Sequence, residues 1–265
     1  MLSNNLKLAV EAALEAGRTI LEIYKSDDFE INIKSDKSPL TIADIKSHNI
    51  ISECLQKTGI PILSEEGRNI PYNIRKNWNL FWMVDPIDGT KEFINRNGEF
   101  TVNIALIENH KPVMGVVYAP VLKNLYFSEK NLGSYKAENI ESYIDLKNSN
   151  LIDLSISSYP DVYTLVVSKS HMNQETQKFL DDKKIEHGQI SLASFGSSLK
   201  ICKVADGIAN CYPRLGPTME WDTAAAHAVA EFAGCKVLLL DNKTILNYNK
   251  SNLLNPFFTV IGSQE

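Results

Sequence analysis

Hydrophobic and polar positions in the first 25 residues repeat with the period of an α-helix. Apolar or small residues recur three or four positions apart, as on one face of a helix, at Leu6, Val10, Ala13, Leu14, Gly17, Ile20, Leu21 and Tyr24. We therefore predict an amphipathic helix over this stretch. A short alternating run at 29–33 predicts a strand, and residues 36–59 predict a loop that leads into a second helix ending at Gly59.

Short apolar runs that end in acidic residues follow the second helix. They occupy residues 60–67 and 79–86, and runs of this kind are typical of buried strands whose ends carry a site. Further apolar runs at 100–107, 112–120 and 124–130 are separated by short turns rich in Asn, Lys and Pro. This pattern predicts an antiparallel meander.

The second half of the chain changes pattern. Residues 137–154 are weakly apolar and rich in Asn and Ser, which suggests a boundary between sublobes. Beyond them, predicted strands alternate with predicted helices, which indicates an α/β arrangement; the strands are 163–170 and 236–241, and the helices are 174–184, 197–207 and 222–234. We expect one globule with an N-terminal α+β sublobe at 1–134 that carries the acidic loops and a C-terminal α/β sublobe at 135–265 that carries substrate-binding residues.

Composition narrows the possible partners. The 265 residues are 44% apolar and 22% charged, as in ordinary globular proteins, and the formal net charge is -5. A negative balance argues against nucleic acid or an anionic membrane surface as the main partner. Any bound anion must therefore be met by local positive charge.

The N-terminal stretch lacks the uninterrupted apolar core of a signal peptide, because it contains Lys7, Glu11, Glu15 and Arg18. No uncharged run elsewhere is long enough to span a bilayer. We therefore expect a cytoplasmic protein, with peripheral contact to the inner membrane left open. The cysteines are scattered and are expected to be buried thiols, without disulfides or a zinc site: Cys54, Cys202, Cys211 and Cys235.

Two aspartates stand three positions apart at the end of the run at 79–86, in the segment Asp85-Pro-Ile-Asp88-Gly89. Like charges this close repel each other unless a cation lies between them. Proline fixes its own backbone and glycine permits a left-handed turn, so the loop can aim two carboxylates and a main-chain carbonyl at one point. Oxygen ligands of this kind suit Mg²⁺. The alternative is an ordinary solvated Asp-Pro turn.

Other acidic residues are candidates for the same site. Glu65 and Glu66 follow a predicted strand, although paired glutamates in a loop are usually solvated. Asp222 opens a predicted alanine-rich helix, where its first expected role is that of the N-cap. A helix N-terminus also favours a bound anion, so such an aspartate can share a metal with phosphate.

Asp44 and two threonines have alternative roles, either in helix capping and turns or in orienting a water. Asp44 lies three residues after Thr41, which predicts a variant capping box for the second helix. Thr90 follows Gly89 and is either a turn hydroxyl or a group whose proton Asp44 accepts, so that the hydroxyl can orient a water. The sequence alone leaves both alternatives open.

Several ordered motifs resemble one known family. The segments at 64–67, 85–93 and 221–234 resemble the signature of the inositol monophosphatase superfamily of magnesium-dependent, lithium-sensitive phosphatases. Longer segments at 85–106, 115–120, 194–200 and 212–227 resemble the CysQ-type 3'(2'),5'-bisphosphate nucleotidase branch, and the likeness covers nearly the whole chain. The resemblance implies the layered α/β/α/β/α sandwich of the sugar-phosphatase fold.

The resemblance also implies roles for individual residues. Two or three Mg²⁺ ions would be held by Glu65, Asp85, the Ile87 carbonyl, Asp88 and Asp222. Glu65 and Thr90 would position the attacking water, and Asp44 would support Thr90. The substrate would contact Asp88, Gly89, Thr90, His171, Ser197, Lys200, Arg214 and Asp222.

The basic residues suggest the substrate. Arg214 lies in a largely apolar, turn-forming segment, where a planar fork suits a second phosphate. Lys200 lies close enough in sequence for its segment to face the same cleft. The resemblance implies hydrolysis of a small molecule, adenosine 3',5'-bisphosphate, to AMP in sulfur metabolism, with its sulfated form as a second substrate. We expect a monomer or weak dimer. The alternatives are an inositol or sugar monophosphatase and a non-catalytic nucleotide sensor of the same fold.

Overall fold

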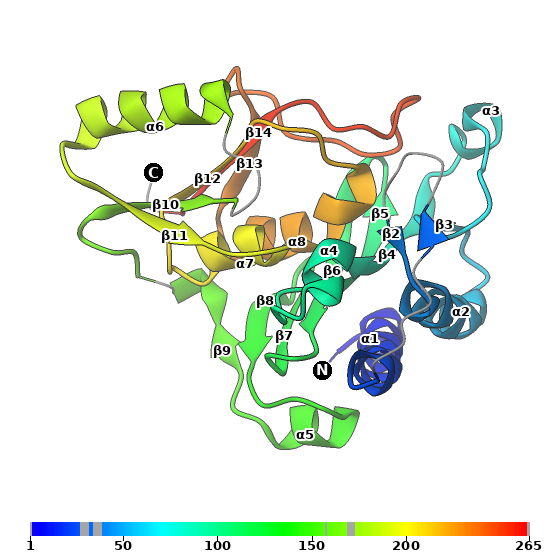
Figure 1. Cartoon of the computed structure of the whole chain (residues 1–265). Helices are drawn as coiled ribbons and strands as arrows, with labels where there is room; N and C mark the ends of the chain where they lie inside the picture. Colours follow the sequence, from blue (N-terminus) through cyan, green and yellow to red (C-terminus); the bar gives the residue numbers. More distant parts are fainter. Residues whose placement is uncertain (1, 27–31, 34–38, 157, 169–172, 264–265) are drawn as a thin grey trace.

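Two large β-sheets and the helices packed on them make up most of the described part of the chain (Figure 1). The computed structural model describes residues 2–26, 32–33, 39–156, 158–168 and 173–263.

The helices form three layers that alternate with the sheets. Helices α1 (Asn4–Tyr24) and α2 (Ile42–Gln56) pack on one face of the first sheet. Helices α7 (Leu199–Ala205) and α8 (Glu220–Phe232) share a hydrophobic core with both sheets. Helix α6 (Gln174–His187) packs on the remaining face of the second sheet. The five layers confirm the expected α/β/α/β/α sandwich.

The first sheet has seven strands in the order β3-β4-β5-β6-β7-β8-β9. Strands β3 and β4 are parallel, and each later pair is antiparallel, which confirms the predicted meander. The strands are β3 (Ile62–Ser64), β4 (Leu80–Asp88), β5 (Thr101–Glu108), β6 (Lys111–Ala119), β7 (Asn124–Glu129), β8 (Gly133–Ala137) and β9 (Ile152–Asp153).

The second sheet has five strands in the order β11-β10-β12-β14-β13. Strand β10 is parallel to both of its neighbours, and β14 is antiparallel to both of its own. The strands are β10 (Tyr163–Val167), β11 (Ile190–Ser194), β12 (Cys211–Arg214), β13 (Lys236–Leu239) and β14 (Phe258–Ile261).

Short elements complete the described residues: β1 (Asn32–Ile33), β2 (Pro39–Leu40), α3 (Tyr72–Arg75), α4 (Thr90–Ile94), α5 (Tyr143–Asn148) and the 3-10 turn Leu154–Ile156. The predicted boundary at 137–154 contains α5 and β9, and β9 still pairs with the first sheet. The chain passes to the second sheet after Asp153. The proposed sublobe boundary at residue 134 stays a prediction.

The alanine-rich sequence of α8 allows it to lie very close to β6. A Cβ atom added to Gly115 of β6 would lie 2.1 Å from the carbonyl oxygen of Ala225 in α8. Only glycine leaves room for the helix backbone at this point.

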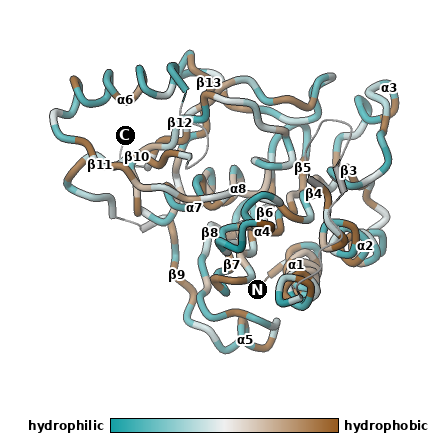
Figure 2. Tube along the Cα trace, viewed as in Figure 1, coloured by the Kyte–Doolittle hydropathy of each residue, from teal (hydrophilic) through white to brown (hydrophobic). Residues whose placement is uncertain are grey.

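The outer helix α6 is largely hydrophilic, as Figure 2 shows and as expected of a helix with one face in solvent.

Most of the predicted elements are present. The first predicted helix is α1, and the predicted N-cap of the second, Thr41, precedes α2. Helix α2 ends at Gln56, three residues before the predicted end, and Gly59 takes a left-handed conformation with φ 68°. Most of the predicted strand at 29–33 lies outside the described residues.

The four cysteines are free thiols, as predicted, and three of them are buried; they are Cys202, Cys211 and Cys235, whereas Cys54 is half-buried. Among the described residues, no helix is both long and apolar enough to cross a membrane.

Candidate functional site

The Asp-Pro turn interrupts the first sheet at the end of β4. The register between β4 and β5 shifts between Asp85 and Asp88, and Gly89 follows with a left-handed φ of 93° as the N-cap of α4. Asp85 is only 1% exposed, and its Oδ1 accepts a 3.1 Å hydrogen bond from the Ile87 N–H. The turn therefore places acidic groups at a break in the ladder, where backbone carbonyls such as that of Ile87 leave the sheet.

Three segments far apart in sequence bring carboxylates together. One oxygen each of Glu65, Asp85 and Asp222 lies within 4.8 Å of the other two. Glu65 is held beside β4 by a 3.1 Å backbone hydrogen bond from its N–H to the Val84 carbonyl. Asp85 Oδ2 is buried and has no hydrogen-bond partner in the part of the chain that the structure describes. A buried carboxylate oxygen without a partner is costly, and a cation would satisfy it.

The carboxylates raise one another's pKa values. Burial, followed by the charges of Glu65, Asp88 and Asp222, raises the pKa of Asp85 well above its usual range. Burial, followed by the charges of Asp88 and Glu65, raises the pKa of Asp222 to about 7. An oxygen-only, strongly acidic set of this kind fits a hard divalent cation.

Asp88 lies beside this cluster and faces the second lobe. Its Oδ2 accepts a 2.6 Å hydrogen bond from the Ser197 hydroxyl, which comes from the turn before α7. The three-carboxylate group does not include Asp88, although its charge acts on both Asp85 and Asp222. Ser197 has φ 54°, a left-handed backbone conformation that is uncommon outside glycine.

Asp44 serves two threonines at once. Its Oδ2 accepts hydrogen bonds from the Thr41 N–H at 2.8 Å and from the Thr41 hydroxyl at 2.6 Å, as in the predicted capping box. Its Oδ1 accepts a 3.2 Å hydrogen bond from the Thr90 hydroxyl. The pairing across the chain that the sequence left open is thus present, while its part in catalysis stays a prediction.

The predicted position of Asp222 in its helix is wrong by three residues. Helix α8 begins at Glu220, the N-cap is Met219, and Asp222 occupies the third helical position. Asp222 Oδ2 accepts from the Met219 N–H at 2.9 Å and from the Thr218 hydroxyl at 2.8 Å. It therefore caps the helix from inside the first turn, as the third residue of a capping box does.

A pocket joins the acidic end of the site to two cations. It is lined by Asp88, Gly89, Glu92, Ser168, Ser197, Ser198, Lys200, Ile201, Tyr212, Arg214, Thr218, Asp222, Thr223 and Phe258. Its walls come from the end of β4, α7, β12 and the start of α8. Glu65, Asp85 and Asp44 do not line this pocket, although Asp222 does and belongs to the acidic cluster as well.

The two cations are side chains of α7 and β12. Lys200 is 8% exposed, and its ammonium donates a 2.7 Å hydrogen bond to the Ser197 carbonyl. Burial lowers the pKa of Lys200 to about 8, with Arg214 adding to the effect and Asp88 opposing it. Arg214 ends β12, so it lies in a strand rather than in the expected turn. Its Nη2 donates to the Pro217 carbonyl, while its buried Nε has no hydrogen-bond partner among the residues that the structure describes.

Sequence reasoning missed several hydroxyls that support the site. Thr101 of β5 is fully buried, and its Oγ1 lies 2.6 Å from Ser197 Oγ and 2.8 Å from Ser198 Oγ. Ser198 in turn donates a 2.8 Å hydrogen bond to the Asn103 side chain. A buried Thr and Asn in a strand that is otherwise apolar are the signal that could have indicated this network.

The histidines have different positions. His171, a predicted substrate contact, lies outside the described residues. His48 and His227 contact hydroxyls of Ser64 and Tyr248, at 2.9 and 2.8 Å. The ring of His187 stacks on Tyr163. Each of these last three rings therefore contacts another side chain of the fold.

Comparison with known proteins gives consistent results. The model of the inositol monophosphatase family matches residues 1–258. The chain is 42% identical over 258 residues to the 3'(2'),5'-bisphosphate nucleotidase CysQ of Salmonella typhimurium. The aligned region covers 96% of this chain and 98% of that protein. Its Escherichia coli K12 counterpart is 40% identical over 253 residues and covers 94% and 96%.

Solved structures agree. A crystal structure of CysQ from Bacteroides thetaiotaomicron, described as a bacterial member of the inositol monophosphatase family, is 47% identical, covers 98% of both chains and has a TM-score of 0.89. The Thermotoga maritima IMPase is 21% identical, covers 98% of this chain and 93% of its own, and has a TM-score of 0.76. At that identity the likeness concerns the fold.

Proposed function

This chain belongs to the inositol monophosphatase family, and we propose that it is a 3'(2'),5'-bisphosphate nucleotidase. In the proposed reaction it hydrolyses the 3'-phosphate of adenosine 3',5'-bisphosphate and yields AMP and inorganic phosphate. Its sulfated form, 3'-phosphoadenylyl sulfate, would be a second substrate. The proposal is supported by the relatives of about 40% identity that carry this name over nearly their full length.

The observation that carries the proposal is a pocket lined by both acidic and basic side chains. Asp88 and Asp222 line it together with Lys200 and Arg214. A substrate with two phosphates would place the phosphate to be cleaved beside the acidic residues, where a cation can screen it. The retained phosphate would meet the two cations, and the buried Nε of Arg214 is a donor without a partner within the described ranges.

The acidic residues fit Mg²⁺, the cofactor we propose. Glu65, Asp85, Asp88, Asp222 and the Ile87 carbonyl would hold two or three ions, and the buried Asp85 Oδ2, which has no hydrogen-bond partner among the described residues, is the observation that most favours a cation here. Bound Mg²⁺ would supply charge stabilisation to the phosphoryl group and to its leaving oxygen. The carboxylates also need it to offset their mutual repulsion.

The water that attacks phosphorus would be oriented by Thr90 and Glu65. The Thr90 hydroxyl donates its proton to Asp44, so its oxygen is left as an acceptor for a proton of the water. Glu65, at the end of β3, would accept the other proton as general base. Asp44 is fixed in turn by Thr41 and would act only through Thr90.

The remaining substrate contacts are proposed from the family motifs. Gly89, Thr90, Ser197 and His171 would complete the site around the substrate, with Gly89 and Ser197 lining the pocket. Lys200, with a pKa of about 8, stays largely protonated at neutral pH and can pair with a dianion.

A phosphate-release panel with Mg²⁺ tests this function. The panel compares adenosine 3',5'-bisphosphate, 3'-phosphoadenylyl sulfate, 3'-AMP, inositol 1-phosphate and fructose 1,6-bisphosphate. We expect the highest kcat/KM for the two 3'-phosphates that carry a second anionic group. A higher kcat/KM for inositol 1-phosphate would contradict the proposal and identify a monophosphatase. An absence of release from all five, with nucleotide binding retained, would indicate a sensor.

A further inference from the structure

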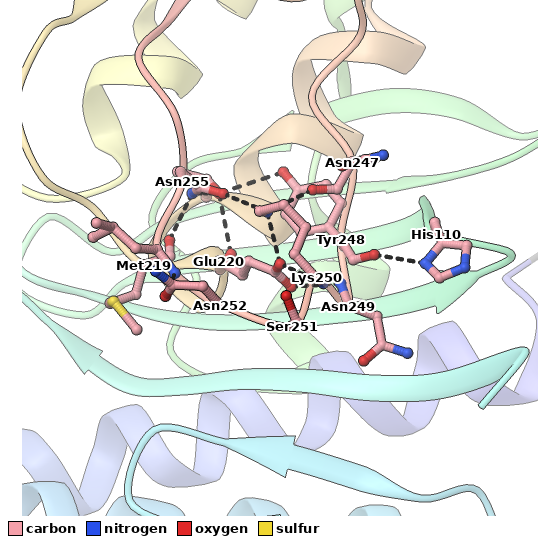
Figure 3. A network of polar contacts seen from close by, with 12 residues as sticks. His110, Met219, Glu220, Asn247, Tyr248, Asn249, Lys250, Ser251, Asn252 and Asn255 are labelled. Carbon is pink, nitrogen blue, oxygen red and sulfur yellow. Dashed lines mark hydrogen bonds and ion pairs between the residues drawn. The ribbon is translucent and has the colours of Figure 1, made fainter. Parts of the chain in front are cut away.

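A loop near the C-terminus, residues 247–255, is held against the start of α8 by a polar network (Figure 3). Its centre is Glu220, the first residue of α8, which is 0% exposed. Glu220 Oε2 accepts a 2.6 Å hydrogen bond from the Asn249 N–H, and Oε1 accepts a 2.9 Å hydrogen bond from the Lys250 N–H. The Lys250 ammonium lies 2.6 Å from Oε1. A carboxylate is buried at low cost only when it is paired in this way.

Residues between strands of the first sheet contact the other side of the 247–255 loop. Arg75, from the segment between β3 and β4, is 3% exposed and donates hydrogen bonds to the Asn249 side chain at 2.8 Å and to the Lys250 carbonyl at 2.7 Å. The Asn249 side chain donates back to the Arg75 carbonyl at 2.8 Å. His110, between β5 and β6, forms hydrogen bonds with the backbone of Tyr248 through its ring and through its carbonyl oxygen. Figure 3 shows the His110 side chain beside the loop.

The same loop also fixes the backbone just before α8. The Asn255 side chain donates a 2.9 Å hydrogen bond to the Met219 carbonyl, and its N–H donates one of 2.9 Å to the Thr218 carbonyl. The Glu220 N–H donates to the Leu253 carbonyl at 2.9 Å. Three successive residues before and at the helix start are therefore held by one loop.

These residues are the ones that orient Asp222. The Met219 N–H and the Thr218 hydroxyl both donate to Asp222 Oδ2, and Asp222 also supplies an oxygen to the acidic cluster. We infer that Glu220, paired with Lys250, is a positioning residue for the metal site, because it locks the 247–255 loop onto the first turn of α8 and so sets where Asp222 meets Glu65 and Asp85. This inference rests on the proposed function, since it assumes that Asp222 binds Mg²⁺.

Two single variants, one matched control and one conservative variant test the positioning role of Glu220 and Lys250. Lys250→Met removes the ammonium but keeps an unbranched apolar stem, and Glu220→Gln keeps the shape of the acid but removes its charge. The control is Lys136→Met, which breaks a different enclosed ion pair, with Asp206 at 3.0 Å, and neither of these two residues lines the pocket. Lys250→Arg keeps the charge and serves as the conservative variant.

The main readout is Mg²⁺ affinity of the purified full chain without substrate, measured by calorimetric titration and by the Mg²⁺-dependent rise in Tm. Loss of outer-shell support for a metal ligand typically weakens metal binding by about 10- to 100-fold. We expect Lys250→Met and Glu220→Gln to weaken it by about tenfold, the low end of that range. Lys136→Met should lower Tm and leave the affinity within about twofold, and Lys250→Arg should retain most of it.

Kinetics give a second readout that simple destabilisation would not change. The variants should need more Mg²⁺ for half-maximal activity and should lose kcat, whereas KM for the bisphosphate should stay near the parent value because Lys200 and Arg214 are untouched. The double variant should bind Mg²⁺ no more weakly than the weaker single variant, because the pair acts as one unit.

The outcomes separate the two proposals. If the parent protein does not bind Mg²⁺, the proposed metal site itself is wrong. If the parent binds Mg²⁺ and both single variants bind it equally well while losing stability as Lys136→Met does, the network is only structural and the positioning role is wrong. If Lys250→Met does not fold, Glu220→Gln and Lys250→Arg give the same comparison.

Discussion

At the scale of single residues, hydroxyl protons link strands β4 and β5 to the turn before α7 in a fixed direction. Ser197 donates its proton to Asp88, so Ser197 Oγ must accept the proton of Thr101 at 2.6 Å. Ser198 donates its own proton to the Asn103 side chain at 2.8 Å. Each group of the chain thus has a defined donor or acceptor role. The left-handed backbone at Ser197 is held in place by this chain and by the Lys200 ammonium on its carbonyl.

The substrate preference depends on Arg214, and its replacement is the most direct residue-scale prediction. Arg214→Ala should remove the fork that we expect to hold the retained phosphate, and losing one partner of such a pair typically costs roughly 2–5 kcal/mol. We expect kcat/KM for adenosine 3',5'-bisphosphate to fall by at least about 30-fold. The value for 3'-AMP should change far less, since 3'-AMP has no 5'-phosphate to bind there.

Lys200→Ala offers a matched comparison. It should lower the ratio of the two kcat/KM values in the same direction but less strongly, because an ammonium is a point charge without the bidentate fork. The measurement is the bisphosphate to 3'-AMP ratio in the parent and in both variants. An unchanged ratio in Arg214→Ala would remove the main reason to place the second phosphate beside Lys200 and Arg214.

At the scale of secondary-structure elements, the close contact between β6 and α8 has a measurable consequence. Gly115→Ala would bring a Cβ to 2.1 Å from the Ala225 carbonyl, which belongs to helix backbone and cannot turn aside. We expect a loss of about 1–3 kcal/mol in the free energy of unfolding, as for other overpacked cores. Because α8 carries Asp222, Mg²⁺ affinity should fall as well.

Gly216→Ala is the control for that substitution. Nothing lies within 4 Å of a Cβ added at Gly216, and its backbone φ lies outside the left-handed region. Chemical denaturation should find this variant within about 0.5 kcal/mol of the parent. If Gly115→Ala were equally neutral, the packing of α8 on β6 would be looser than described.

The elements also show which parts of the sequence are easy to interpret. Helix α1 follows a clear period, and Thr41 with Asp44 gives a capping box for α2, so both helices were predictable. The start of α8 was placed at Asp222 because an aspartate is a common N-cap. The actual start at Glu220 depends on hydrogen bonds from a loop about 30 residues later, which local sequence patterns do not contain.

At the scale of the whole molecule, the crowded carboxylates predict how stability depends on pH when metals are removed. The pKa of Asp222 is raised from 3.8 to about 7, and that of Asp85 is also raised. Between these values the folded protein keeps protons that the unfolded chain releases, so the free energy of unfolding decreases as pH rises. With EDTA, Tm should fall by about 5 °C or more between about pH 5 and pH 8.

Two further measurements check this pH dependence. Excess Mg²⁺ should raise Tm most at the alkaline end, because it binds the deprotonated carboxylates. Asp222→Asn should flatten the curve recorded in EDTA. The same pH dependence in EDTA for the parent and for Asp222→Asn would show that the acidic cluster is not under the repulsion inferred from its geometry.

The overall arrangement could be predicted only in part from the sequence. The acidic motifs are recognisable by residue type, and the resemblance to the family assigns Glu65, Asp85 and Asp222 to one site. Their convergence within 4.8 Å depends on three elements from both lobes. The hydroxyl chain through Thr101 and the pairing of Glu220 with Lys250 were missed, because both depend on contacts between segments about 30 to 100 residues apart.

The free thiols give the molecule a practical property. Burial raises the pKa values of Cys202 and Cys235, and Cys211 is buried as well, so these three are poor nucleophiles at neutral pH. Cys54, half-buried on α2, is the most accessible of the four, although burial raises its pKa too. A maleimide dye or spin label should therefore attach preferentially at Cys54. The natural chain thus offers a reporter position on the outer layer of the first lobe without any engineered cysteine.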